Sequence, residues 1–133
     1  MRFRSARGGL IQRTQDIMRE ILKIERGDWC EICGVRRENM GVFHILPVGK
    51  YPRIRFQFEN VLLSCWIPCH FNWHQTFKAA KEIDKKIKQL RGEDYEDRLA
   101  LLDRCAPKLT QVRIQMTHDA FKAHLSNIRG KSK

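Results

Sequence analysis

The sequence predicts an α+β fold, in which a short β-hairpin and a metal site are flanked by helices. Three observations support this class. Two cysteine pairs each have a spacing that lets both thiolates bind one ion. Two short apolar segments, residues 42–46 and 61–63, lie between the pairs and have the composition of strands. Amphipathic stretches with the helical period precede and follow this region.

The chain has the length of one domain and a strongly positive charge. Its 133 residues include 26 lysines and arginines against 15 acidic residues, which gives a formal net charge of +11 and a pI near 9.9. Such an excess fits either a basic solvated surface or attraction to a polyanion, of which nucleic acid is the commonest. We therefore expect a single domain, residues 1–133, that binds nucleic acid.

The cysteines indicate a metal site in an intracellular protein. No apolar run approaches the roughly 18 to 20 residues that cross a bilayer, and the start of the chain lacks an apolar signal core, so we expect a cytoplasmic protein without a membrane partner. A reducing compartment favours metal ligation over disulfides. The expected ligands of one structural zinc are Cys30, Cys33, Cys65 and Cys69, which leaves Cys105 over.

The N-terminal region predicts a basic arm followed by a helix. Residues 1–9 carry Arg2, Arg4 and Arg7 with two glycines and little to bury. We expect this arm to be mobile, either as a disordered tail or as an arm that reaches along DNA. The apolar side chains that follow fall on one face of a helix predicted for residues 10–26.

The first strand and the loop after it carry a histidine and several cations. The strand predicted for residues 42–46 contains His44 and is followed by a proline, which cannot donate to a sheet ladder. An imidazole with an ordinary pKa of about 6.5 can accept a proton at neutral pH. The loop offers Lys50, Arg53 and Arg55 to a phosphate backbone.

A pair of histidines follows the second strand. His70 and His74 are four residues apart, so on a helix their ring nitrogens can converge on one ion. The predicted helix continues with an apolar seam and a basic back, where Lys78, Lys81 and Lys85 would contact nucleic acid.

The C-terminal third predicts two further helices. One ends near Pro107. Residues 109–116 alternate apolar and polar side chains, which fits either a short strand or the approach to a helix. Thr117 is a suitable N-cap for a last helix with Phe121 and Leu125 facing inward.

These motifs resemble the HNH (ββα-metal) endonuclease superfamily. The segment VFHILP, which contains His44, resembles the first strand of that fold. The segment NVLLSC, which begins at Asn60, resembles the second strand. The segment CHFNWH, which contains His70 and His74, resembles the helix. The closest likeness is to the phage NinG-type recombination nucleases, through an R-F-x-x-x-N run that ends at Asn60 and the later stretch GEDYEDRLALL. The likeness covers residues 28–126.

The resemblance implies an activity and a division of the chain. It implies a metal-dependent endonuclease that hydrolyses phosphodiester bonds in DNA largely without sequence preference. It also implies a role in phage recombination or on branched DNA, inside a bacterial host. The zinc-clamped ββα core would occupy residues 28–76, and a helical extension residues 77–129.

The same resemblance assigns roles to four residues. His44 would be the general base, and Asn60 would brace the loop and orient it. His70 and His74 would hold a catalytic divalent cation, which could be Mg, Mn, Ni or Zn.

The sequence departs from the family pattern in two places. Phe43 stands where many of these enzymes have an Asp or His as a further metal ligand, so waters, phosphate oxygens or a carboxylate such as Glu59 would complete the coordination. Cys65 and Cys69 are separated by three residues instead of two, and Pro68 is placed to absorb the extra residue in a bulge.

Two other classes of protein fit parts of the sequence. A zinc-knuckle nucleic-acid-binding protein without catalysis is favoured by Phe43. A zinc domain that binds other proteins fits the cysteines but leaves the charge and the pair His70 and His74 unexplained.

Overall fold

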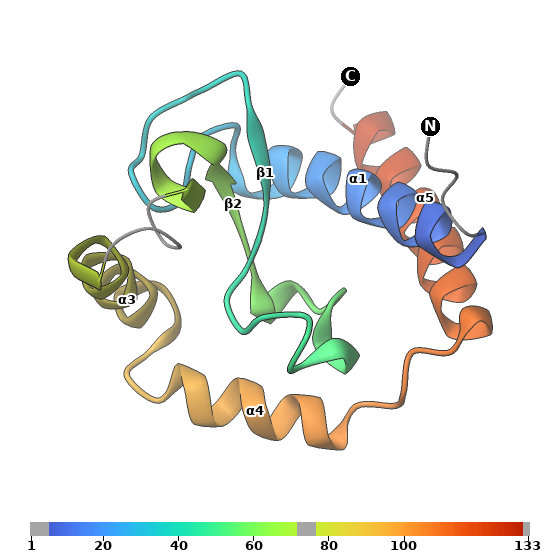
Figure 1. Cartoon of the computed structure of the whole chain (residues 1–133). Coiled ribbons are helices and arrows are strands. Elements are labelled where there is room, and N and C mark those ends of the chain that lie inside the picture. Colours follow the sequence, from blue (N-terminus) through green and yellow to red (C-terminus); the bar gives the residue numbers. More distant parts are fainter. Residues whose placement is uncertain (1–5, 72–76, 132–133) are drawn as a thin grey trace, which may run out of the picture.

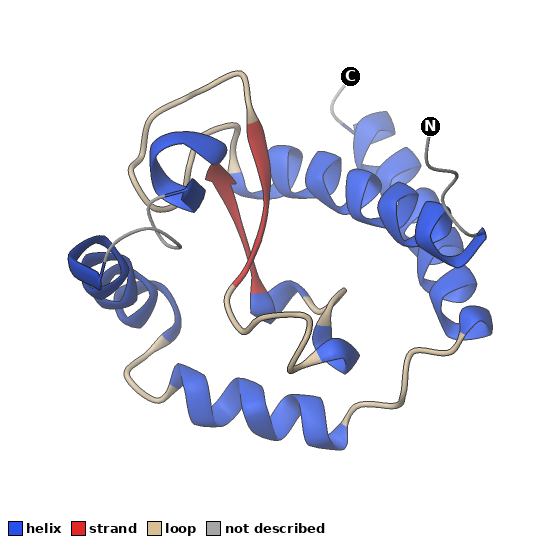
Figure 2. Cartoon of the chain, in the orientation of Figure 1, coloured by secondary structure: helices blue, strands red, loops and turns tan. Residues whose placement is uncertain are grey.

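The computed structural model describes residues 6–71 and 77–131. Their elements are, in chain order, α1 (Ala6–Arg26), β1 (Met40–His44), two 3₁₀ turns (Pro52–Ile54 and Phe58–Asn60), β2 (Val61–Cys65), a π-helical turn (Trp66–His70), α3 (Phe77–Arg91), α4 (Tyr95–Cys105) and α5 (Gln111–Lys131). The predicted α+β class is confirmed: helices surround one antiparallel pair of strands (Figure 2). Over these described ranges, no helix is both long enough and apolar enough to span a membrane.

The hairpin is covered by helices on both faces (Figure 1). Val42 and Leu63 pack in one cluster with side chains of α1 and α5, whereas Phe43 and Leu62 pack in a second cluster with α3 and α4. In the antiparallel register, Phe43 lies opposite Leu62 and Val42 opposite Leu63. A strand that is buried on both faces has an almost continuous apolar sequence, which explains why β2 does not alternate.

Polar side chains cover the outer edge of β2. The backbone N–H of Glu31 donates to the Leu63 carbonyl at 2.8 Å, and the Glu31 carboxylate accepts the Leu63 N–H at 2.6 Å. Arg26 and Arg91 both donate to the Val61 carbonyl, at 2.7 and 3.1 Å. These bonds satisfy the backbone groups at the edge of β2 and fix the hairpin to the ends of α1 and α3. They matter because an isolated two-stranded ribbon is only marginally stable.

Two predicted boundaries are corrected at the N-terminal side. Strand β1 begins at Met40 and ends at His44, two residues earlier than the predicted 42–46. Helix α1 begins at Ala6, so residues 6–9 are the start of a helix, where a mobile arm was expected. The reason is tertiary: Leu10 is buried in the core, and packing of an apolar face stabilises a helix turn whose glycines alone would not favour it.

The start of the last helix is also corrected. Residues 109–116 lead into and begin α5, which starts at Gln111, so they form no strand. Thr117 lies inside this helix, where its hydroxyl donates to the Arg113 carbonyl at 2.9 Å. The N-cap is Thr110, whose hydroxyl oxygen accepts the backbone N–H of Arg113 at 3.2 Å.

Replacement of the true cap should measurably destabilise the protein. We expect Thr110→Ala to lower the free energy of unfolding by about 1 kcal/mol, because an N–H of the first helical turn loses its acceptor. Thr117→Ala is the matched control, since its hydroxyl bonds to a carbonyl that the helix already uses. Chemical denaturation of both variants tests this, and equal losses would contradict the assignment of the cap.

Candidate functional site

Four cysteines from three segments meet at one point. Cys30 and Cys33 lie in the turn after α1, Cys65 ends β2, and Cys69 lies in the π-helical turn. Their sulfur atoms all lie within 4.8 Å of one another, and Cys33 Sγ is 3.8 Å from Cys65 Sγ. Tetrahedral zinc with Zn–S bonds of about 2.3 Å requires S···S separations of about 3.8 Å. The four predicted ligands therefore fit one zinc-sized ion.

The turn Trp66–His70 contains the additional residue between Cys65 and Cys69. Its backbone is extended at Ile67 (φ −130°, ψ 126°), directly before Pro68, and both thiols still reach the same centre. Cys105 is exposed at the end of α4 and does not belong to the cluster.

Burial disfavours the ionised form of two of the four thiols. Burial is the main factor that raises the pKa of Cys65 and of Cys69 above the ordinary value. For Cys33, burial also opposes ionisation, but hydrogen bonds from Val35, neighbouring thiols and Arg37 outweigh it and lower the pKa to about 7. Because zinc binds thiolates, the ion itself would supply the charge that stabilises the buried pair in that form.

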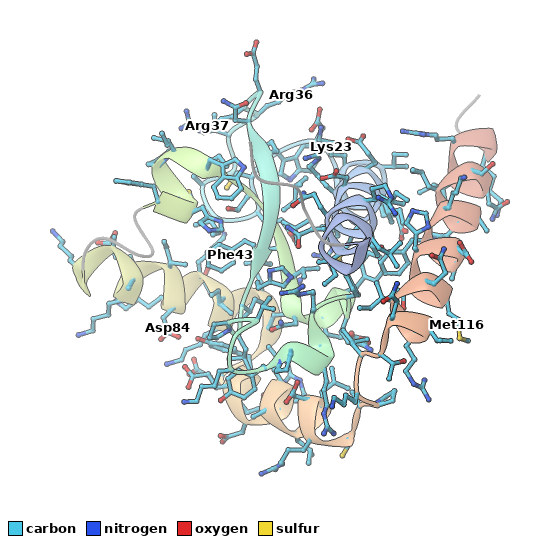
Figure 3. All side chains as sticks on the ribbon, turned by 45° about the vertical axis from the view of Figure 1, so that its right-hand side comes forward. Lys23, Arg36, Arg37, Phe43, Asp84 and Met116 are labelled. Atoms are coloured by element: carbon cyan, nitrogen blue, oxygen red, sulfur yellow. The ribbon has the colours of Figure 1, made fainter. Side chains whose placement is uncertain are left out.

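Arg37 is a neighbour of the cluster that sequence reasoning missed. Its pKa is raised first by a hydrogen bond to Cys33 and further by the charges of Cys65 and Cys33. Figure 3 shows Arg36 and Arg37 where the chain enters β1. The spacing of four residues after Cys33 was the available signal, but arginines in loops are too common for it to be specific.

His44 is held in one orientation at the end of β1. Its Nε2 lies 3.0 Å from the carbonyl oxygen of Arg55. A carbonyl can only accept, so Nε2 carries the hydrogen of the neutral ring, and the lone pair is on Nδ1. Burial is the main cause that lowers the pKa of His44 to about 4, and the positive charges of Arg55 and His70 contribute to the shift. The imidazole is therefore neutral at pH 7.

Asn60 fixes the loop that follows His44. Its side chain is fully buried, Oδ1 accepts the backbone N–H of Leu46 at 2.9 Å, and Nδ2 donates to the Leu46 carbonyl at 3.2 Å. These two bonds join the residue before β2 to the segment after β1. Asn60 thus braces the loop: its side chain bonds to Leu46, and its backbone carbonyl accepts the N–H of Ile45, the residue after His44, at 2.8 Å.

Loss of these two hydrogen bonds should destabilise the protein. We expect Asn60→Ala to lower the free energy of unfolding by about 2 to 5 kcal/mol, because both backbone groups of Leu46 lose their buried partner. Ser64→Ala is the control: Ser64 is also buried in this hairpin, but its hydroxyl bonds only to the adjacent Cys65 carbonyl. Thermal and urea unfolding measure both, and a loss no larger than that of Ser64→Ala would refute the role of Asn60.

His70 lies between two aromatic rings. The Trp66 ring stacks on it with centroids 4.3 Å apart and planes at 32°, and the Phe43 ring meets it edge-on at 5.3 Å. Phe43 projects from β1 toward the side of the hairpin that α3 covers (Figure 3). The predicted partner His74 lies outside the described residues. His70 thus contacts an indole and a phenyl ring, and it also acts electrostatically on His44.

No carboxylate joins the histidines in the part of the chain that the structure describes. Within residues 6–71 and 77–131, the four cysteines form the one group of three or more His, Cys, Asp or Glu side chains close enough to hold a metal. Glu59 is exposed and belongs to no such group.

The predicted nucleic-acid contacts fall into separate regions. Arg2 and Arg4 precede the described residues, and Arg7 lies in the first turn of α1. The side chains of Lys50, Lys78, Lys81 and Lys85 are exposed, the last three on α3. Arg53 donates to the Ala106 carbonyl at 3.3 Å, and Arg55 is half-buried with its charge close to His44. Arg55 therefore lies next to His44, whereas Lys81 of α3 and Lys50 line a separate hollow beside the residues that follow His44.

In comparisons with known proteins, no family model, no curated protein and no solved structure matches this chain. The fold and the site define an α+β protein with a small antiparallel hairpin and a four-cysteine cluster that could hold a structural metal ion such as zinc.

Proposed function

We propose that this protein is a metal-dependent DNA endonuclease of the HNH type, with a ββα-metal core around the hairpin. The observation that carries the proposal is the neutral, oriented imidazole of His44 beside His70, on a hairpin whose far end is tied by four cysteines. The sequence resemblance to NinG-type nucleases points the same way, and it suggests recombination or branched DNA as the setting.

The proposed chemistry is hydrolysis of a phosphodiester bond. His44 Nδ1 takes a proton from a water molecule, while Nε2 remains bonded to the Arg55 carbonyl. The water oxygen forms a bond to phosphorus as the bond to the 3′ oxygen breaks. A divalent cation, held by His70 and His74, would stabilise negative charge on the phosphate and on the departing oxygen.

DNA is the proposed partner on grounds of charge. With a net charge of +11, the chain favours contact with phosphates, which carry no sequence information. Binding that is largely independent of sequence follows from this.

A second candidate function is nucleic-acid binding by a zinc knuckle without catalysis. It is favoured by the Phe43 ring, which lies 5.3 Å from the His70 ring where the family resemblance implies a metal ligand. An apolar ring beside His70 reduces the number of protein ligands for a second ion.

Cleavage in the presence of an added ion tests the first function against the second. Protein purified with its zinc should nick supercoiled DNA and cut linear or branched DNA when Mg²⁺, Mn²⁺ or Ni²⁺ is added, and should leave them intact when no ion is added. DNA binding is measured separately without the ion. If the protein binds DNA but cuts no substrate with any of these ions, the endonuclease function is refuted and non-catalytic nucleic-acid binding takes its place.

A further inference from the structure

A cleft opens between α1, the loop after β1 and the start of α5. Its volume is about 720 Å³, within the range of sites that hold small molecules. Nine residues line it: Ile11, Val48, Gly49, Pro52, Arg53, Arg55, Lys108, Leu109 and Ile114. Three segments far apart in sequence thus form one concave surface.

The lining combines cations with an apolar floor. Arg53, Arg55 and Lys108 are basic, and none of the lining residues is acidic. The Arg53 guanidinium is held at the rim by its bond to the Ala106 carbonyl at 3.3 Å. Asp103 accepts the backbone N–H of Arg53 at 3.0 Å but does not line the cleft. Since a guanidinium has five N–H donors, Arg53 keeps donors for an anion.

The apolar floor makes a bare inorganic anion a poor match for the cleft. Ile11 lies on α1, Leu109 precedes α5, and Ile114 lies in the first turn of α5 and is buried; none of the three offers a polar side-chain atom. A ligand that matches the cleft has phosphate groups at the basic rim and an apolar face below them. A nucleotide unit of a DNA strand has both, because its deoxyribose and base lie beside its phosphate.

Arg55 connects the cleft to the candidate general base. Its side chain lines the cleft, its backbone carbonyl lies 3.0 Å from His44 Nε2, and its positive charge acts on the His44 ring. One residue thus contributes both to the lining of the cleft and to the acceptor that holds the His44 ring.

We propose that this cleft binds the DNA strand next to the cleaved bond, with its phosphates on Arg53, Arg55 and Lys108 and a sugar or base on the apolar floor. The inference rests on the proposed function for the identity of its ligand. It adds Lys108, from the segment before α5, to a contact surface that sequence alone placed in the loop after β1.

A pair of opposite charges at Gly49 tests the proposal without disturbing the fold. A Cβ added at Gly49 meets no atom within 4 Å, and the residue is not in the left-handed region, so longer side chains fit there. Gly49→Glu should weaken binding of a short labelled DNA duplex, and Gly49→Lys should strengthen it. The matched control is Gly130→Glu: Gly130 also has open space, lies on α5 away from the cleft and gives the same change in net charge.

Salt dependence tests the contribution of Lys108. Lys108→Gln should make the slope of log K against log salt less steep by about 1, as expected for one lost phosphate contact. Lys122→Gln, an exposed lysine of α5 outside the cleft, should leave the slope unchanged.

Fluorescence anisotropy without added divalent ion gives both readouts, so the result does not depend on cleavage. The proposal is overturned if the Gly49 and Lys108 variants change affinity and slope no more than their controls. If the Gly49 and Lys108 variants change DNA binding but the protein cuts no DNA, the cleft binds DNA and the proposed endonuclease activity is refuted. If the protein cuts DNA but these variants have no such effects, the endonuclease activity stands and the proposed role of the cleft is refuted.

Discussion

Removal of the metal ion from the cysteine cluster should unfold the hairpin region of this protein. The cluster joins the turn after α1 to the end of β2 and the π-helical turn, and a hairpin of two strands has little stability of its own. Structural zinc contributes on the order of 10 kcal/mol in small peptides, which is comparable to the whole stability of a domain, about 5 to 15 kcal/mol. We expect loss of the cooperative melting transition after chelation, measured by circular dichroism.

Two serine variants make this test specific. Cys65→Ser removes a buried ligand and should yield protein with less than one zinc per chain and a strongly lowered melting temperature. Cys105→Ser changes an exposed thiol outside the cluster and should leave both unchanged. Elemental analysis gives the zinc content. A Cys65→Ser protein that contains no zinc and melts like the parent would show that the cluster is not a structural metal site.

Replacement of His44 should remove cleavage while DNA binding is retained. Loss of a positioned general base lowers the rate by about 10² to 10⁴. We expect His44→Ala to show this loss at every concentration of added ion, because excess cation cannot replace a proton acceptor. His70→Ala provides the contrast: if His70 is a ligand, a higher ion concentration should restore part of its activity by mass action.

A glutamine at position 44 separates catalysis from structure. The Gln amide can donate to the Arg55 carbonyl as His44 Nε2 does, but it has no nitrogen lone pair that accepts a proton. We expect His44→Gln to fold like the parent and to be as inactive as His44→Ala. Plasmid nicking and thermal melting check the two properties, and recovery of cleavage in the Gln variant would count against a general base.

The sequence predicted those features that depend on local spacing or on residue type. Cysteine pairs three and four residues apart specify two turns with convergent thiols, so the four cysteines of the cluster were identifiable before the fold was known. An apolar stripe with the helical period defined α1, and β-branched or apolar runs defined both strands to within two residues. Asn60 was identified through a family resemblance, and its two bonds to Leu46 give that position a physical reason.

Other features were outside the reach of local patterns. The alternation in residues 109–116 fits a strand as well as a helix, and the choice depends on Ile114 packing in the core with α1 while Thr110 caps the helix. The glycines near the N-terminus predicted a mobile arm, but burial of Leu10 extends α1 to Ala6. In both cases long-range packing outweighed a weak local preference.

By itself, then, the sequence determined the four-cysteine cluster, the α+β class and the basic character, because each follows from residue type and short spacing. Only the tertiary structure decided the surroundings of His44: the Arg55 carbonyl that fixes its ring, the electrostatic influence of His70 and the cleft completed by Lys108. Backbone acceptors carry no signature in a sequence, and a cleft exists only once segments that are distant in the chain are folded together.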